Sequence, residues 1–187
     1  MSTPSTFLQM ISTVNESGEL RLELVEKPVP VPETDQVLVR IEATPINPSD
    51  QGVMFGWADI SAATSAGAGQ HKVLTAPVSE QGMRVMKARM GQALPVGNEG
   101  AGTVVATGSG GLAKSLEGKI VAVMGGSMYA QYRCVDAAAC LPLLEGHSAK
   151  DGASCFVNPL TALSMVETMK MEGHTALVHT AAASNLG

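Results

Sequence analysis

The sequence has few aromatic and charged residues and no long apolar run. Aromatic residues make up 3% of the 187 residues and charged residues 16%, whereas methionine occurs 11 times and glycine 20 times. The core must therefore consist of aliphatic side chains and methionine. No stretch approaches the ~18–20 apolar residues of a membrane span, and the N-terminus lacks the basic and apolar regions of a secretory signal. We predict a soluble, cytoplasmic protein without a membrane partner.

Basic residues and cysteines are also scarce. Seventeen acidic residues oppose 12 Lys and Arg, which gives a net charge of −5. This balance argues against nucleic acid as a partner, because phosphate binding needs clustered cations. Cys134, Cys140 and Cys155 are odd in number and too far apart for Cys-x-x-Cys metal pairs. We expect reduced thiols rather than a disulfide framework.

Short strands dominate the chain up to about residue 145. Alternating or β-branched segments fall at residues 20–25, 36–43, 100–106, 119–124 and 129–135. The Gly125–Gly126 turn predicts a hairpin between the last two segments. Three prolines at alternating positions predict an extended edge segment over residues 27–34. This unit is therefore expected to be β-rich.

Residues 56–92 are the least patterned part of the chain. Met83, Met86 and Met90 are spaced by three and four residues, which predicts a short amphipathic helix. We favour a stripe that faces the core, and a methionine-lined substrate wall is the alternative interpretation.

The pattern changes after Gly146. Residues 150–171 predict a helix with a kink or restart at Pro159, and residues 175–179 predict a buried strand. A helix, a strand and a small-residue loop open a βαβ unit, which needs ~30 or more residues to complete. We predict a first unit over residues 1–148 and an incomplete second unit over residues 149–187. The exposed strand edge of the second unit could pair with a second copy, so a homodimer is compatible with the sequence.

Five segments occur in the order typical of one known family. They are residues 37–50, 96–104, 118–135, 158–162 and 182–187. Together they resemble the medium-chain dehydrogenase/reductase superfamily, specifically its zinc-free NADPH:quinone oxidoreductase branch. The resemblance implies a mainly β fold with helices. A GroES-like, partly open β-barrel catalytic domain would be followed by the truncated start of an α/β Rossmann domain.

The resemblance also bears on zinc. Zinc-dependent members carry Cys at the position of Asn47, His at the position of Asn98 and a lobe with four cysteines, which this chain lacks. Neutral amides are poor replacements for the Cys, His and carboxylate ligands of zinc. Glu99 keeps the family's carboxylate, but one carboxylate does not make a site. We expect no bound metal.

Without a metal, hydride transfer to a quinone or an enone fits best, with NADPH as the donor and NADH left open. By resemblance the Asn47 amide faces the nicotinamide and binds the cofactor or an acceptor oxygen; alternatively it only stabilises a turn. Ser49 falls at the position of a proton-relay hydroxyl, although a serine there can also be a cap. Thr161 matches a threonine beside the nicotinamide, and its alternative is a bond back to the preceding helical turn.

The terminal loop is expected to hold the pyrophosphate through Ala182, Ser184, Asn185 and Gly187. Many relatives have two glycines where this chain has Ser184 and Asn185, which reduces the room for phosphate beside the backbone.

We therefore predict the N-terminal part of an NADPH-dependent oxidoreductase acting on a small-molecule acceptor, with the 187 residues alone inactive. An enoyl-thioester reductase of the same superfamily and a noncatalytic GroES-like binding module are the alternatives.

Overall fold

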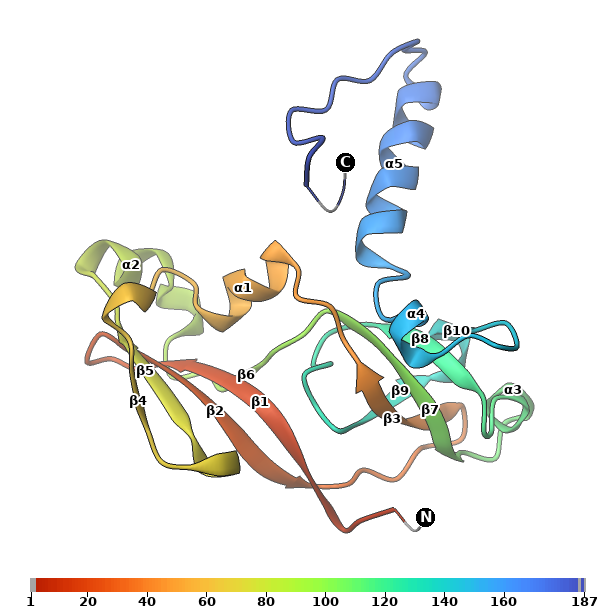
Figure 1. The fold of residues 1–187 in the computed structure, drawn as a ribbon, viewed down its shortest axis with the longest axis horizontal. Helices are drawn as coiled ribbons and strands as arrows, with labels where there is room; N and C mark the ends of the chain where they lie inside the picture. Colours follow the sequence, from red (N-terminus) through yellow and green to blue (C-terminus); the bar gives the residue numbers. More distant parts are fainter. Residues whose placement is uncertain (1–2, 185, 187) are drawn as a thin grey trace.

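Two five-stranded antiparallel sheets form most of the protein (Figure 1). The structure is a computed structural model that describes residues 3–184 and 186. The first sheet has the order β4-β5-β2-β1-β6. Its strands are β1 (Thr6–Val14), β2 (Glu19–Pro28), β4 (Thr64–Ala66), β5 (Val73–Pro77) and β6 (Leu94–Pro95). The second sheet has the order β10-β8-β7-β3-β9. Its strands are β3 (Gln36–Ala43), β7 (Glu99–Thr107), β8 (Ile120–Met124), β9 (Tyr132–Asp136) and β10 (Cys140–Pro142).

Side-chain alternation explains the long hairpin of β1 and β2. Leu20 and Leu22 point into the core, and Arg21 and Glu23 between them form a 2.9 Å surface ion pair. A strand with one buried face alternates in this way because successive side chains point to opposite faces.

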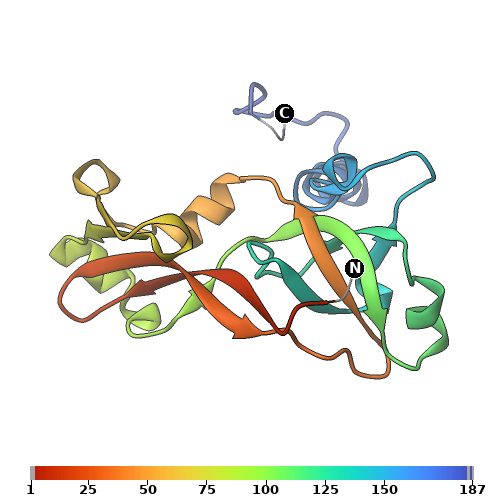
Figure 2. The same cartoon turned by 60° about the horizontal axis from the view of Figure 1, so that its bottom comes forward.

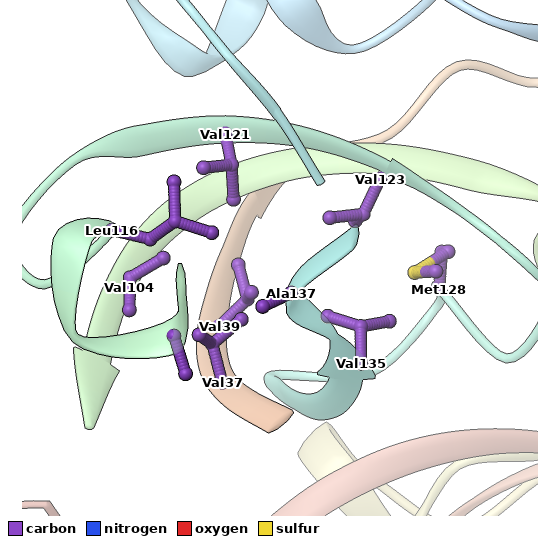
Figure 3. Packing of buried hydrophobic residues seen from close by; sticks show 10 residues of the cluster. Val37, Val39, Val104, Leu116, Val121, Val123, Met128, Val135 and Ala137 are labelled. Carbon is purple, nitrogen blue, oxygen red and sulfur yellow. The ribbon is translucent and has the colours of Figure 1, made fainter. Parts of the chain in front are cut away.

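The core of the second sheet is aliphatic, as the composition predicts. Figure 3 shows valines from β3, β7, β8 and β9 pointing toward one another, with Met128 at one end of the cluster. The buried members of this cluster are Val37, Val39, Val104, Ala113, Leu116, Val121, Val123, Met128, Val135 and Ala137.

Five short or medium helices complete the part of the chain that the structure describes. They are α1 (Pro48–Met54), α2 (Glu80–Val85), α3 (Gly111–Ser115), α4 (Ala149–Gly152) and α5 (Val157–Met171). Four 3-10 turns lie at Ile60–Ala62, Gly69–His71, Lys87–Arg89 and Ala137–Ala139. Helix α5 projects from the β-rich body in both views (Figures 1 and 2). The predicted helix over residues 150–171 is thus split, and Pro159 is the third residue after the restart, where its missing N–H leaves no hydrogen bond unmade.

The methionine stripe faces the core, as we favoured. Met86 is buried, and Met83 and Met90 pack against the same cluster as Val14 and Leu20 of the first sheet. The predicted helix is α2 followed by a 3-10 turn.

The predicted hairpin after β8 is wrong. β9 pairs with β3, whereas β8 lies between β7 and β10. The Gly125 and Gly126 N–H groups both donate to the Asn98 carbonyl, and Met128 N–H donates to the Gly97 carbonyl. The glycine turn therefore folds onto the loop before β7 and leads the chain away from β8.

The predicted buried strand at residues 175–179 is also wrong for this chain. The segment forms no strand, and Leu177 and Val178 are 46% and 90% exposed. A strand needs neighbours for its N–H and C=O groups, and within residues 3–184 and 186 this segment pairs with none. The division at residue 148 stays a prediction.

Candidate functional site

The turn before α1 is fixed by its two prolines and by a capping contact. Asn47 is the N-cap residue with an extended backbone (φ −89°, ψ 157°), and Pro48 occupies the first helical position. Proline is favoured there because its φ suits a helix and its missing N–H would be unpaired anyway. Asn47 N–H donates to Asp50 Oδ2 at 2.8 Å, which closes the turn.

Asp50 also joins α1 to the loop before β7. The residue is 1% exposed, and its Oδ1 accepts the Asn98 N–H at 2.8 Å. Tyr129 lies nearby, and its hydroxyl donates to the Pro45 carbonyl at 2.8 Å. Burial, reinforced by the charge of Asp50, raises the pKa of Tyr129 to about 12. The phenol therefore keeps its proton and stays a donor at neutral pH.

A buried carboxylate connects this turn to α5. Glu99 is 1% exposed, and its Oε1 accepts the Asn47 Nδ2–H at 2.9 Å. Its Oε2 accepts the N–H groups of Phe156 and Val157 at 2.9 and 3.0 Å, at the N-terminus of α5. The helix dipole favours an anion at this end, so one side chain ties the Asn47 turn to the start of the projecting helix.

Ser49 and Asn98 form the solvent-facing part of the cluster. Asn98 Nδ2 donates to Ser49 Oγ at 2.9 Å, and Ser49 is exposed. Within the described part of the chain, the Ser49 hydroxyl has no acceptor for its own proton. It is therefore oriented as an acceptor by Asn98 and free to donate outward.

The structure brings together Asn47, Ser49, Asn98 and Glu99, but it does not bring the other predicted cofactor residues to this cluster. Thr161 Oγ1 donates to the Val157 carbonyl at 2.6 Å, the back-bonded alternative that the sequence left open. Ala182 and Ser184 are exposed in a turn after α5, and Asn185 and Gly187 lie outside the described residues.

Two contacts of this cluster were not predicted from the sequence. Sequence reasoning noted Glu99 but not its bonds to Phe156 and Val157, and it gave Tyr129 no role at this site. The available signal was a glutamate among Gly and Ala at the start of a buried strand, since a buried charge requires partners.

Neither a metal-ligand cluster nor a membrane-spanning helix is found in the part of the chain that the structure describes. No three His, Cys, Asp or Glu side chains of residues 3–184 and 186 are grouped to hold a metal ion. None of the helices in that part is both long and apolar enough to cross a bilayer.

Solved structures of other proteins share this fold. No protein-family model and no curated protein matches the sequence, but solved structures do. A protein provisionally named NADPH:quinone reductase from Mesorhizobium loti is 32% identical over the whole chain, with a TM-score of 0.68. The quinone oxidoreductases of Coxiella burnetii (20% identity, TM-score 0.58) and Thermus thermophilus (23%, 0.54) match 88% and 87% of the chain and share its fold.

This structural similarity identifies the fold as the GroES-like, partly open barrel of the oxidoreductases. The chain is similar to solved NADPH:quinone oxidoreductases, which agrees with the resemblance of its sequence to the medium-chain dehydrogenase/reductase superfamily. It spans about half the length of the solved chains that it matches: 50%, 45% and 41% for the three above.

Proposed function

We propose that this chain is the acceptor-binding part of an NADPH-dependent reductase of quinones or enones. The exposed Ser49 hydroxyl, oriented by Asn98 beside the buried side chains of Asn47 and Asp50, carries the proposal. The 32% identity to the M. loti protein, named as an NADPH:quinone reductase, supports the reaction class.

The chemistry of the donor set supports a reaction without zinc. At the positions that the resemblance gives to zinc ligands, this chain has two amides, and both are engaged. Asn47 Nδ2 donates to Glu99, and Asn98 Nδ2 donates to Ser49. Zinc prefers thiolate, imidazole and carboxylate ligands, so polarisation of the acceptor falls to hydrogen bonds.

The proposed step needs a hydride and a proton. In this class of reaction the reduced nicotinamide supplies the hydride, and the acceptor carbonyl gains negative charge on its oxygen. Ser49 Oγ–H stabilises that charge by a hydrogen bond, and its exposure lets solvent replace a transferred proton. The products are the quinol or the saturated ketone and the oxidised nicotinamide.

We assign Asn47 a positioning role in this step. Its side chain is 2% exposed, and its amide nitrogen is bonded to Glu99. It therefore holds the turn that presents Ser49. A direct contact with cofactor or acceptor, as predicted from the sequence, would have to use its amide oxygen.

The described residues do not build a dinucleotide site by themselves. The Thr161 hydroxyl is bonded to Val157, and residues 175–179 lack the neighbouring strands of a parallel sheet. We therefore assign NADPH binding to the whole protein and derive no contact with it here. A small-molecule acceptor is the proposed partner, and a homodimer stays a prediction.

Turnover by the longest polypeptide that the gene encodes tests the proposal. NADPH oxidation is followed with a quinone, an enone and an enoyl thioester. Ser49→Ala should lower kcat within the ~10²–10⁴-fold range of general acid–base effects, and Ser115→Ala on α3 is the matched surface control. Quinone turnover that survives Ser49→Ala contradicts the assigned role. Turnover with the thioester alone favours the alternative reductase, and none with any acceptor favours a binding module.

A further inference from the structure

A cavity of about 360 Å³ lies between α1 and α2 and has no part in the proposed reductase reaction. Its walls are mostly apolar and include one cation. The lining residues are Gly52, Gly56, Trp57, Val85, Met86, Ala88 and Arg89. This volume is within the ~300–1,000 Å³ range of small-molecule sites.

Arg89 is only partly satisfied by the protein. Its Nη2 donates to Ser12 Oγ at 2.8 Å, and Ser12 in turn donates to the Met54 carbonyl at 2.8 Å. Its Nε is buried without a hydrogen-bond partner. Within residues 3–184 and 186, no carboxylate lies within ion-pair distance of this guanidinium.

The charge of Arg89 is therefore fixed in place and unneutralised. Burial lowers the pKa of Arg89, but a guanidinium stays protonated in proteins. The Ser12 contact positions the group without supplying a negative charge, and a buried donor without a partner is costly. An anion that entered the cavity would supply both the charge and the missing acceptor.

Two glycines keep the cavity open beside this cation. Gly56, with φ +54°, follows the C-cap residue of α1, and a Cβ there would lie 2.4 Å from Met86 Sδ and 3.4 Å from Arg89 Nη1. Gly52 lies inside α1, and a Cβ built on it would meet nothing within 4 Å. The cavity is therefore open beside α1 because Gly52 and Gly56 carry no side chains.

The lining also selects among anions. Phosphate carries up to two charges at neutral pH and would leave one unpaired, because Arg89 is the only charged residue in the wall. A carboxylate carries one charge and pairs with a guanidinium in bidentate geometry. The Trp57, Val85 and Met86 side chains favour an apolar body attached to that carboxylate.

We propose that this cavity binds an organic monocarboxylate, with the carboxylate on Arg89 and the apolar chain along Trp57 and Met86. This inference goes beyond the reductase activity proposed above and does not depend on it. The cavity lining includes neither Ser49 nor the partners of Ser49, although Ser49 and Gly52 both belong to α1.

Trp57 is the only tryptophan of the chain, so its fluorescence reports on this cavity directly. Hexanoate, which is transparent at the excitation wavelength, should change the emission saturably. Hexanamide, with the same chain and no charge, should bind at least ~10-fold more weakly. Acetate, with the same charge and no chain, should also bind more weakly.

Matched variants identify the residues involved. Arg89→Gln should weaken hexanoate binding about 10- to 100-fold. Arg84→Gln, which removes an exposed arginine of α2, should leave it within about 2-fold, since exposed charges are screened. Gly52→Leu keeps Arg89 and adds a side chain where Gly52 leaves open space, so it should also weaken binding and still fold.

Three results would overturn the proposal. These are hexanamide or acetate binding as tightly as hexanoate, unchanged hexanoate affinity in Arg89→Gln and Gly52→Leu, and no saturable change in the unmodified chain. Circular dichroism confirms that each variant is folded. If Arg89→Gln does not fold, the Gly52→Leu result decides.

Discussion

Replacement of Glu99 by glutamine should loosen the contact between the Asn47–Asp50 turn and α5. The carboxylate accepts three hydrogen bonds, from Asn47 Nδ2, Phe156 N–H and Val157 N–H. Glutamine keeps one acceptor oxygen and places an NH₂ group against the remaining donors. If the retained oxygen serves Phe156 and Val157, the Asn47 amide nitrogen loses its partner.

The magnitude follows from burial. Hydrogen bonds to a charged group contribute about 1.5–3 kcal/mol each, and an unsatisfied buried donor costs about 1–3 kcal/mol. Because Glu99 is 1% exposed, water cannot replace the lost contact. Glu99→Gln should therefore lower the free energy of unfolding by roughly 2–4 kcal/mol.

Urea unfolding measures the global effect, and hydrogen exchange of the Phe156 and Val157 amides measures the local one. The matched control is Glu42→Gln, a neighbouring but more exposed carboxylate bonded to Arg40 and Thr103. Its effect should stay below about 1 kcal/mol, as for surface ion pairs. Equal stability of the two variants, with unchanged exchange at the start of α5, would refute the reasoning.

Three further outcomes are expected. The unfolding free energy should fall between pH 10 and about 12, because burial raises the pKa of Tyr129 to about 12 from its unfolded value of ~10. The neutral phenol stabilises the fold fully below pH 10, and this contribution is lost as the pH rises toward 12. Urea unfolding at a series of pH values should therefore show a smaller fall for Tyr129→Phe. Residues 1–187 should not bind NADPH tightly in calorimetric titration, since residues 175–179 lack sheet neighbours; micromolar binding would contradict this. Elemental analysis should find no stoichiometric zinc, because Asn47 and Asn98 are amides, and one tightly held zinc per chain would show otherwise.

Local sequence patterns predicted five of the ten strands among the described residues, because side-chain alternation and turn residues are local properties. β3 has the predicted bounds, since a period-2 run is stopped at Pro45. β9 was found near its predicted place but was assigned the wrong neighbour. The Asn98 carbonyl that captures the Gly125–Gly126 turn lies far away in sequence, and no local pattern reports such a contact.

The site was predicted less completely than the fold, for the same reason. Resemblance placed Asn47, Ser49, Asn98 and Glu99 in one region, and the structure joins them by hydrogen bonds. The bond from Phe156 to Glu99 spans 57 residues of sequence and became visible only after folding. Arg89 gave no sequence signal, because a single arginine in a methionine-rich segment is ordinary.

The attachment of α5 at Glu99 also has a mechanical consequence. A helix of 15 residues is about 22 Å long at a rise of 1.5 Å per residue. A tilt of only about 5° at its anchored end moves the far end by about 2 Å, and displacements of ~1 Å can cost ~10²-fold in rate when reacting groups must be aligned. The Glu99 carboxylate at the start of α5 therefore sets the direction of the helix. The direction of the helix in turn sets the position of the residues that follow it in the chain.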